Sequence, residues 1–193
     1  MDFLKRMQNF DFYIEQLSVD LNSYELKMFR VQHDEGQLTK YLTKFSKKHQ
    51  ASNTNKIYLV RYSSTGQIVA WFGLKNATLP YNDAGDNFLI PAIELTHFAV
   101  DERFKNPIND KSSVRTGEFI FWNYIIPIVK EVSNKVGCKA LFIFAIDTTK
   151  LVKYYMNVLK FRELPDTNEK QFFEYAEPGY DEGCRFLYFP LSL

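Results

Sequence analysis

The chain has 193 residues, of which 46% are apolar and 17% aromatic, and its formal net charge is +1. This length and apolar content are sufficient to bury a substantial core, and we predict a single domain spanning residues 1–193. No apolar run reaches the roughly 20 residues that a membrane span needs, and the first residues lack the apolar centre of a secretory signal. We therefore expect a cytoplasmic protein without membrane association.

The cysteines and histidines argue against a disulfide framework and against a metal site. Cys138 and Cys184 match neither kind of spacing, and we interpret them as buried thiols. His33, His49 and His97 are scattered along the chain, and none has the spacing of zinc ligands. We predict no bound metal.

The two signs of charge are unevenly distributed along the chain. Residues 36–82 contain no Asp or Glu, whereas residues 163–182 are strongly acidic. Within the basic segment, an apolar helical face is set against a face of lysines. The apolar residues are Leu38, Tyr41, Leu42 and Phe45, and the lysines are Lys40, Lys44, Lys47 and Lys48. This lysine face is either the solvated side of an amphipathic helix or a surface that contacts phosphates.

The first part of the chain predicts a candidate strand, helices and a hairpin. The amino terminus is irregular through Ser23 apart from the candidate strand at Phe12–Leu17, and the lysine helix comes later. Two strands then flank the turn-rich residues Ser63–Gly66, which predicts an antiparallel hairpin. The two strands are Ile57–Tyr62 and Gln67–Leu74, and the polar stretch Pro80–Asn87 leads into the next strand.

The middle of the chain predicts a β-α-β unit. An apolar strand at Ile90–Val100 precedes an apolar helix that opens at Arg115–Gly117 and closes at Gly137, and a second apolar strand follows at Ala140–Ile146. Such a unit implies parallel neighbouring strands, and their ligands bind at the carboxyl ends, beside the helix start. The turn around Gly117 is therefore the predicted ligand site.

The order of these elements resembles that of the GNAT superfamily of acyl-CoA-dependent N-acetyltransferases. Thr96–Asp101 is similar to the cofactor strand of the family, and Val114–Gly117 stands at its pyrophosphate loop. Ala140–Asp147 followed by Leu151–Phe161 is similar to its strand and its "Phe-Tyr-x-x-x-Gly-Phe" helix end. The resemblance implies an α/β (α+β) fold, a mixed sheet of about six to seven strands with helices on both faces. Residues 29–62 also resemble the branch of toxins that acetylate aminoacyl-tRNA.

The resemblance implies acetyl-CoA as the acyl donor and a primary amine as the acceptor. The pyrophosphate would meet the helix start, and the pantetheine amides would pair with the backbone of the cofactor strand. The residues implied are Arg115, Thr116 and Gly117 for the first contact and Phe98, Ala99 and Val100 for the second. The acceptor is a small amine or peptide drawn by the acidic segment, or an aminoacyl-tRNA drawn by the lysine face.

Three residues are candidates for the catalytic proton transfers. The resemblance places Tyr155 as the acid that protonates the leaving thiolate, although its helical position also fits a core aromatic residue. Glu94 and His97 are candidate bases, but strand alternation points them to opposite faces unless a bulge intervenes. Proton loss through water is a third option, and Tyr154 is a lesser candidate for the acid.

The chain departs from the family pattern at four places. Val114 and Phe119 replace the first and last residues of the pyrophosphate loop, which leaves Gly117 as its single glycine, and Phe119 would block phosphate unless it turns inward. Pro127 is expected to kink the helix, and Lys160 replaces the glycine before the final Phe161. Two function classes therefore stay open, an active acetyltransferase and a catalytically degenerate binding or regulatory module. The final strand at 185–190 leaves room for a homodimer through sheet edges.

Overall fold

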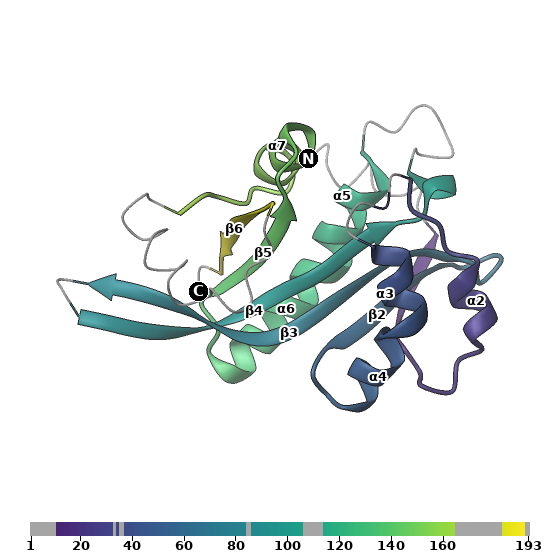
Figure 1. The fold of residues 1–193 in the computed structure, drawn as a ribbon, viewed down its shortest axis with the longest axis horizontal. Coiled ribbons are helices and arrows are strands. Elements are labelled where there is room, and N and C mark those ends of the chain that lie inside the picture. Colours follow the sequence, from purple (N-terminus) through teal and green to yellow (C-terminus); the bar gives the residue numbers. More distant parts are fainter. Residues whose placement is uncertain are drawn as a thin grey trace. The chain divides into compact units, whose positions relative to one another are not determined.

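The computed structural model describes residues 11–32, 34, 37–83, 86–105, 114–164 and 183–191. Within these ranges six strands form one mixed sheet in the order β1-β2-β3-β4-β5-β6, and helices accompany them (Figure 1). This is the predicted α/β class. The chain divides into two compact units, Met1–Leu74 with His97–Ile125 and Lys75–Thr96 with Ile126–Leu193, which we call unit 1 and unit 2. That they act as a single domain stays a prediction.

The strands of unit 1 confirm the predicted hairpin. β1 (Phe12–Gln16) pairs antiparallel with β2 (Lys56–Tyr62), and β2 pairs antiparallel with the first part of β3 (Ile68–Asp83). Val60 lies opposite Ala70 and Arg61 opposite Ile68, so Val69 is an extra residue that makes a bulge. The bulge changes the alternation, and as a result Ile68 and Trp71 both join one buried cluster.

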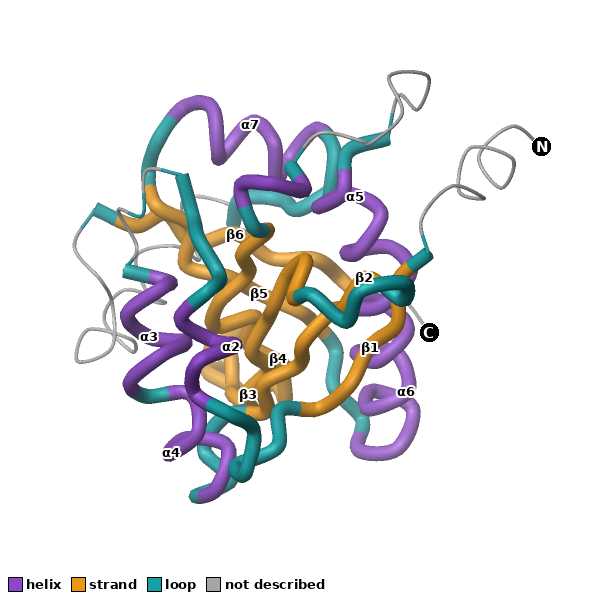
Figure 2. The backbone as a smooth tube through the Cα atoms, turned by 90° about the vertical axis from the view of Figure 1, so that its right-hand side faces the viewer, coloured by secondary structure: helices purple, strands orange, loops and turns teal. Residues whose placement is uncertain are grey.

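Three short helices cover one face of the unit 1 strands, while α5 (Thr116–Ile120) lies on the opposite face (Figure 2). The three short helices on the first face are α2 (Ser23–Lys27), α3 (Leu38–Lys44) and α4 (Ser46–Ala51). Leu26 and Leu42 pack with Ile57, Leu59 and Trp71 in the buried cluster between these helices and the strands. The helices on both faces agree with the predicted architecture.

The lysine helix was predicted as one piece, and the structure divides it in two. The Asp34 carboxylate accepts hydrogen bonds from the N–H groups of Leu38 and Thr39, which fixes the start of α3. At Phe45 the backbone leaves the ideal helix, with a φ of −116°, and the hydroxyl of Ser46 donates to the carbonyl of Leu42 at 2.5 Å. This side-chain bond competes with the helical ladder and explains the break.

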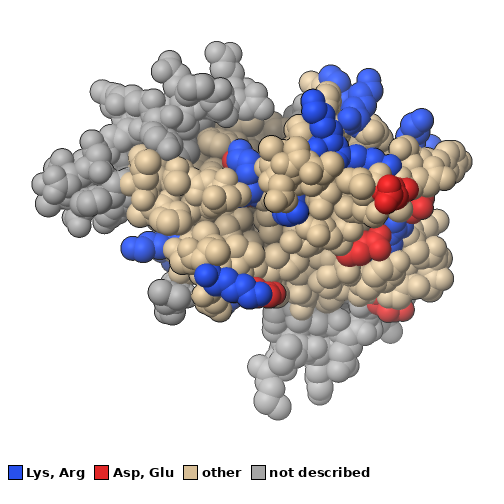
Figure 3. Space-filling view, turned by 90° about the horizontal axis from the view of Figure 1, so that it is seen from below, with Lys and Arg blue, Asp and Glu red and all other residues tan. Residues whose placement is uncertain are grey.

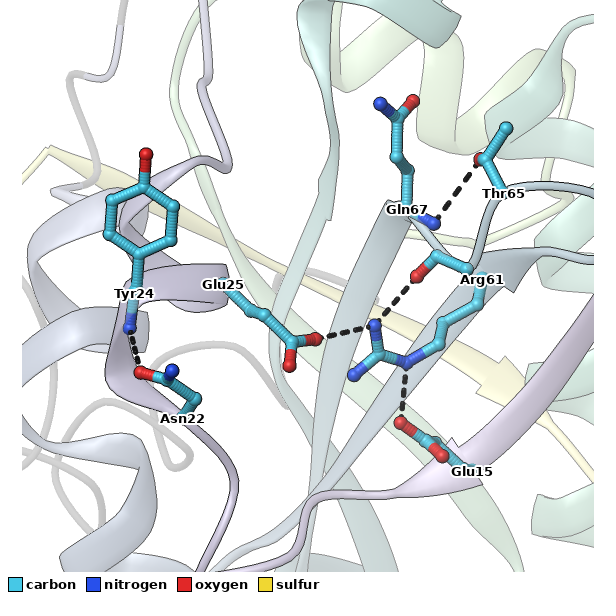
Figure 4. A network of polar contacts seen from close by, with 8 residues as sticks. Glu15, Asn22, Tyr24, Glu25, Arg61, Thr65 and Gln67 are labelled. Carbon is cyan, nitrogen blue, oxygen red and sulfur yellow. Dashed lines mark hydrogen bonds and ion pairs between the residues drawn. The ribbon is translucent and has the colours of Figure 1, made fainter.

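A buried arginine joins three elements of unit 1. Arg61 is 6% exposed, and its guanidinium contacts Glu15 of β1 at 2.5 Å and Glu25 of α2 at 2.8 Å (Figure 4). It also donates to the carbonyl of Gly66 in the hairpin turn at 2.7 Å. A buried charge is tolerated when its donors are used in this way, and Arg61 is thereby a structural residue.

Strands β3 and β4 (Asp86–Val100) are longer than the sequence predicted. The stretch Pro80–Asn87 was expected to be a polar lead-in, but its described residues at both ends belong to the two strands. In unit 2, the Lys75 ammonium lies 2.7 Å from the Glu94 carboxylate, and Leu79 packs in the buried cluster of this unit. These contacts come from distant residues and do not appear in the local pattern.

Unit 2 contains the predicted parallel pair. β4 pairs parallel with β5 (Ala140–Ile146) at residues 92–94, and β5 pairs antiparallel with β6 (Cys184–Pro190). α6 (Ile126–Val136) precedes β5, and α7 (Thr149–Asn157) follows it. Gly137, with a φ of +76°, ends α6 as the sequence predicted. The core of the unit contains Leu79, Ala92, Ala140, Phe142 and Phe186.

The kink predicted at Pro127 takes the form of a π turn. α5 is followed by a π turn at Phe121–Ile125, and α6 continues from there. Proline has no N–H, and its ring clashes with the carbonyl one turn earlier, so the chain widens just before Pro127. The sequence predicted a single kinked helix, and the structure resolves it into these three pieces.

The two cysteines are not joined by a disulfide. Cys138 is buried and Cys184 half-buried, and both are free. Burial raises the pKa of the Cys138 thiol.

Of the helices that the structure describes, none combines the length and the apolar character needed to cross a bilayer.

Candidate functional site

The first turn of α5 carries the predicted pyrophosphate contacts, all within unit 1. Arg115 is the N-cap, with extended backbone, an exposed side chain and no side-chain capping bond. The first helical hydrogen bond runs from the N–H of Phe119 to the carbonyl of Arg115 at 3.0 Å. The N–H groups of Thr116 and Gly117 therefore precede the helical ladder, at the positive end of the helix dipole. Such groups suit an anion.

The side chains of the two residues after the cap have different roles. Thr116 is 1% exposed, and its hydroxyl donates to the carbonyl of Phe104 at 2.5 Å. Only its backbone N–H is left for a ligand. Gly117 is half-buried, and its φ is not positive, so what the glycine provides is the missing side chain rather than an unusual backbone.

Phe119 turns inward, and the steric block that the sequence suggested does not occur. Its side chain is 6% exposed, and its ring meets those of Phe12 and Tyr124 edge to face, with centroids 6.0 and 6.1 Å apart. The Tyr124 hydroxyl donates to the carbonyl of Phe12 at 2.7 Å. Phe119 is thus part of the core of unit 1.

The predicted cofactor strand ends in an anchored carboxylate. Phe98 and Val100 of β4 are half-buried, and Ala99 between them packs in the buried cluster of unit 1. Asp101 follows with no exposed surface, and its carboxylate accepts bonds from the N–H groups of Arg30 and Arg103 and from the Arg103 guanidinium. The backbone of Phe98–Val100 is therefore held firmly at its carboxyl end.

Opposing effects set the acidity of Asp101. Burial alone would raise the pKa of its carboxyl, but the hydrogen bonds and charge of Arg103 and the N–H of Arg30 outweigh burial and lower this pKa. Asp101 was predicted as the end of the cofactor strand, and its anchoring role was not predicted. The sequence did contain a signal for this role, because Asp101 directly follows an apolar strand and stands two residues before Arg103.

Tyr155, the predicted acid, lies in α7 of unit 2. It is 5% exposed, and its ring meets Phe161 edge to face at a centroid distance of 5.5 Å. Burial, and to a lesser extent Tyr154, raises the pKa of the Tyr155 phenol well above its ordinary value. The phenol therefore stays protonated at neutral pH, as an acid must. Its catalytic role stays a prediction.

The two candidate bases lie in different units and in different surroundings. In unit 2, the Glu94 carboxylate is paired with the Lys75 ammonium. In unit 1, the His97 ring stacks on Tyr41 at a centroid distance of 3.7 Å and on Trp71 at 5.3 Å. Each side chain thus has a structural reason for its place, and neither assignment as a base is tested by these contacts.

Lys160 occupies the position where the family pattern has glycine, and the backbone shows why glycine suits it. Its φ is +64°, in the left-handed region that side chains disfavour. The next residue, Phe161, donates its N–H to the carbonyl of Tyr155 at 3.0 Å, which closes the end of α7. The turn is therefore retained without the glycine.

The predicted lysine face is less uniform than its sequence. Lys40, Lys44 and Lys48 are exposed, whereas the Lys47 ammonium donates to the carbonyl of Leu21. On the face of the molecule drawn in Figure 3, basic side chains gather at the upper right, and acidic side chains lie below them. His49 is bonded to the Tyr41 hydroxyl at 2.8 Å, and His33 lies outside the described residues. In the described part of the chain, no group of His, Cys, Asp and Glu could hold a metal ion.

Comparisons with known proteins were made by sequence and by structure. No protein-family model matches the chain, and no curated protein is similar to it in sequence. Solved structures are similar. A tyrosine-to-phenylalanine variant of the toxin AtaT, bound to the C-terminus of the antitoxin AtaR and acetyl-CoA, matches with a TM-score of 0.62 and 20% identity over 93% of both chains.

Two further structures extend this likeness. A KacTA–DNA complex matches with a TM-score of 0.62 and 20% identity, over 93% of this chain and 92% of the other. A bacterial toxin matches with a TM-score of 0.69 and 11% identity, over 93% of this chain and 90% of the other. The fold is GNAT-like. The predicted GNAT-like fold is thus confirmed, and the structures that share this fold include toxins.

Proposed function

We propose that this chain is an N-acetyltransferase that moves an acetyl group from acetyl-CoA to a primary amine. The GNAT-like fold supports the reaction class. The observation that carries the proposal is the inward position of Phe119, which leaves the first turn of α5 without the bulky side chain that would exclude a phosphate. The same observation removes one of the two grounds for the alternative of a degenerate binding or regulatory module, the predicted block by Phe119. The other ground, the missing glycines of the loop, still applies.

The chain offers contacts to both the diphosphate and the pantetheine arm of acetyl-CoA. The N–H groups of Thr116 and Gly117 and the exposed Arg115 guanidinium suit the diphosphate. The backbone of Phe98, Ala99 and Val100 suits the pantetheine amides, which pair as an added strand would. When bound, acetyl-CoA supplies the acetyl group as a thioester.

Tyr155 is the proposed acid, because its protonated phenol can donate to the leaving thiolate. Glu94 and His97 stay candidate bases, with proton loss through water as the third route. The similar structures include tyrosine-to-phenylalanine variants of AtaT and of KacT. The same substitution at Tyr155 tests the acid in this chain.

Calorimetric titration with acetyl-CoA tests the proposal directly. We expect saturable heat with a Kd between about 1 µM and 1 mM, the usual range for such ligands. Acetyl-pantetheine, which has no diphosphate, is the matched control and is expected to bind at least about tenfold more weakly, because it cannot use the α5 turn. Absence of saturable heat with acetyl-CoA would refute the proposal.

For the acceptor, we propose an aminoacyl-tRNA that contacts the exposed lysines of α3 and α4. Replacing Lys40, Lys44 and Lys48 together with glutamine is expected to reduce the slope of log K against log salt by about 3, because each phosphate contact contributes about one unit. The measurement is binding to aminoacyl-tRNA at several salt concentrations.

The matched control for this experiment replaces Lys130, Lys135 and Lys139, which are exposed in unit 2, and makes the same change of net charge. The control is expected to keep the wild-type slope. Equal slopes for both triple variants would exclude this lysine surface, and a small amine or peptide would then be the acceptor to examine.

We also propose that the protein is cytoplasmic and that its 193 residues act as one domain.

A homodimer would form through an edge strand of the sheet, and the two edge strands are β1 and β6. Part of the β6 edge is already paired, because Arg162 forms a bridge with Tyr188. We therefore propose β1 as the edge that pairs in the dimer.

A further inference from the structure

Two side chains in the first turn of α5 are anchored to other parts of unit 1. The Thr116 hydroxyl donates to the carbonyl of Phe104, which lies in a short 3₁₀ helix at Glu102–Phe104. The Phe119 ring packs against Phe12 of β1 and Tyr124 of the π turn. One turn of helix is therefore fixed to two separate segments.

Phe119, Phe12 and Tyr124 all contact one another. The Tyr124 hydroxyl donates to the carbonyl of Phe12 at 2.7 Å, and the Phe12 ring meets Tyr62 of β2 at a centroid distance of 6.0 Å. The carbonyl of Phe119 accepts a bond from the side chain of Asn123 at 2.7 Å. Strand β1 thus contacts the helix through both a ring and a carbonyl group, and we call Phe12, Phe119 and Tyr124 the clamp.

Helix geometry explains how the clamp acts on the turn. Side chains in an α-helix point back toward its N-terminus, so the Phe119 ring covers the turn that contains Arg115 and Thr116. A glycine in that turn adds backbone freedom, which would blur the directions of the N–H groups. An anchored ring at one end and an anchored hydroxyl at the other oppose that freedom.

We propose that Phe119 and Thr116 are positioning residues, which hold the N–H groups of the α5 turn in the directions that bind the diphosphate of acetyl-CoA. This inference rests on the proposed function. In this chain the anchored Phe119 stands where the family pattern has a small residue at the end of the loop. The loop has fewer glycines than the family pattern, and its fixed backbone N–H groups compensate for them. Preorganised donors bind more tightly because less order has to be imposed on binding.

The first test compares Phe119→Ala with Phe119→Leu. In the alanine variant we expect the Kd and the KM for acetyl-CoA to rise by at least about tenfold, while kcat at saturating acetyl-CoA stays within about twofold of wild type. The leucine variant refills most of the space and is expected to recover most of the affinity. At the other anchor, Thr116→Val should weaken binding and Thr116→Ser should restore it.

The matched control is Phe72→Ala. Phe72 is also buried in unit 1, where its ring stacks on that of Tyr58 at a centroid distance of 5.0 Å. We expect Phe72→Ala to lower the Tm as Phe119→Ala does and to leave the Kd for acetyl-CoA unchanged. An equal loss of affinity in both alanine variants would overturn the inference, as would wild-type affinity in Phe119→Ala.

A milder variant keeps the test decisive if Phe119→Ala does not fold. Tyr124→Phe removes only the hydrogen bond to Phe12, and we expect the Kd for acetyl-CoA to rise by about threefold. An unchanged Kd in this variant contradicts the clamp. Failure of the wild-type protein to bind acetyl-CoA would instead refute the proposed function itself, so the two failures are distinguishable.

Discussion

Replacing Tyr155 with phenylalanine is expected to lower kcat by roughly 10²- to 10⁴-fold, the usual contribution of a positioned acid or base. The Kd for acetyl-CoA should stay within about twofold of wild type, because the aromatic ring and its contact with Phe161 are retained. The measurement is thiol release from acetyl-CoA in the presence of the acceptor, together with calorimetry. Wild-type turnover in the variant would exclude Tyr155 as the acid.

The pH dependence follows from the environment of Tyr155. Burial raises the pKa of its phenol, so the protonated form persists above the ordinary tyrosine pKa of about 10. We expect kcat of the wild-type protein not to fall on the alkaline side up to about pH 10.

Tyr154→Phe is the matched control for the Tyr155→Phe substitution, since Tyr154 is the neighbouring, half-buried tyrosine of the same helix. It is expected to keep wild-type turnover.

Replacing Asp101 with asparagine is expected to lower the free energy of unfolding at pH 7 by roughly 3 kcal/mol. The carboxylate has no exposed surface and accepts bonds from the N–H groups of Arg30 and Arg103 and from the Arg103 guanidinium. An amide offers one acceptor oxygen in place of two and no charge, so buried donors lose their partner. Urea unfolding of both proteins measures the difference.

The same variant should show a defined dependence on pH. The pKa of Asp101 is lowered in the folded state, so its stabilisation is fully present above the unfolded pKa and is lost as the pH falls through the folded pKa. The difference in unfolding free energy between wild type and Asp101→Asn should therefore narrow below about pH 4. Glu131→Gln, at an exposed carboxylate paired with Lys135, is the control and should change stability little. A difference that stays constant with pH would contradict this account of Asp101.

Elements with a strong local pattern were predictable from the sequence. Ala140–Ile146 was predicted as a strand and is β5 with the same bounds, because a short apolar run between a glycine and an N-cap sequence has few alternatives. The helix start at Arg115–Gly117 and its end at Gly137 were also predicted correctly. In each case the residues that decide the structure are close together in the chain.

Features that depend on distant residues were not predictable. The extended parts of β3 and β4 belong to a sheet in which Lys75 meets Glu94, nineteen residues later, and the inward Phe119 packs on Phe12, more than a hundred residues earlier. One local feature was also missed, the division of the lysine helix, where the Ser46 hydroxyl donates to the carbonyl of Leu42 only four residues earlier. The periodicity of apolar residues predicts neither the length of these strands nor the orientation of these side chains.

The bond between Tyr124 and Phe12 joins residues 112 positions apart. On the ribosome, β1 emerges early and must wait for β2 before it can pair, and for Tyr124 before that bond can close. Closing so large a loop is entropically unfavourable until other contacts have formed, so this step belongs late in folding. The nascent chain would therefore acquire a rigid α5 turn only after Tyr124 has emerged, when the contacts among β1, β2 and the helices that precede α5 can already be in place.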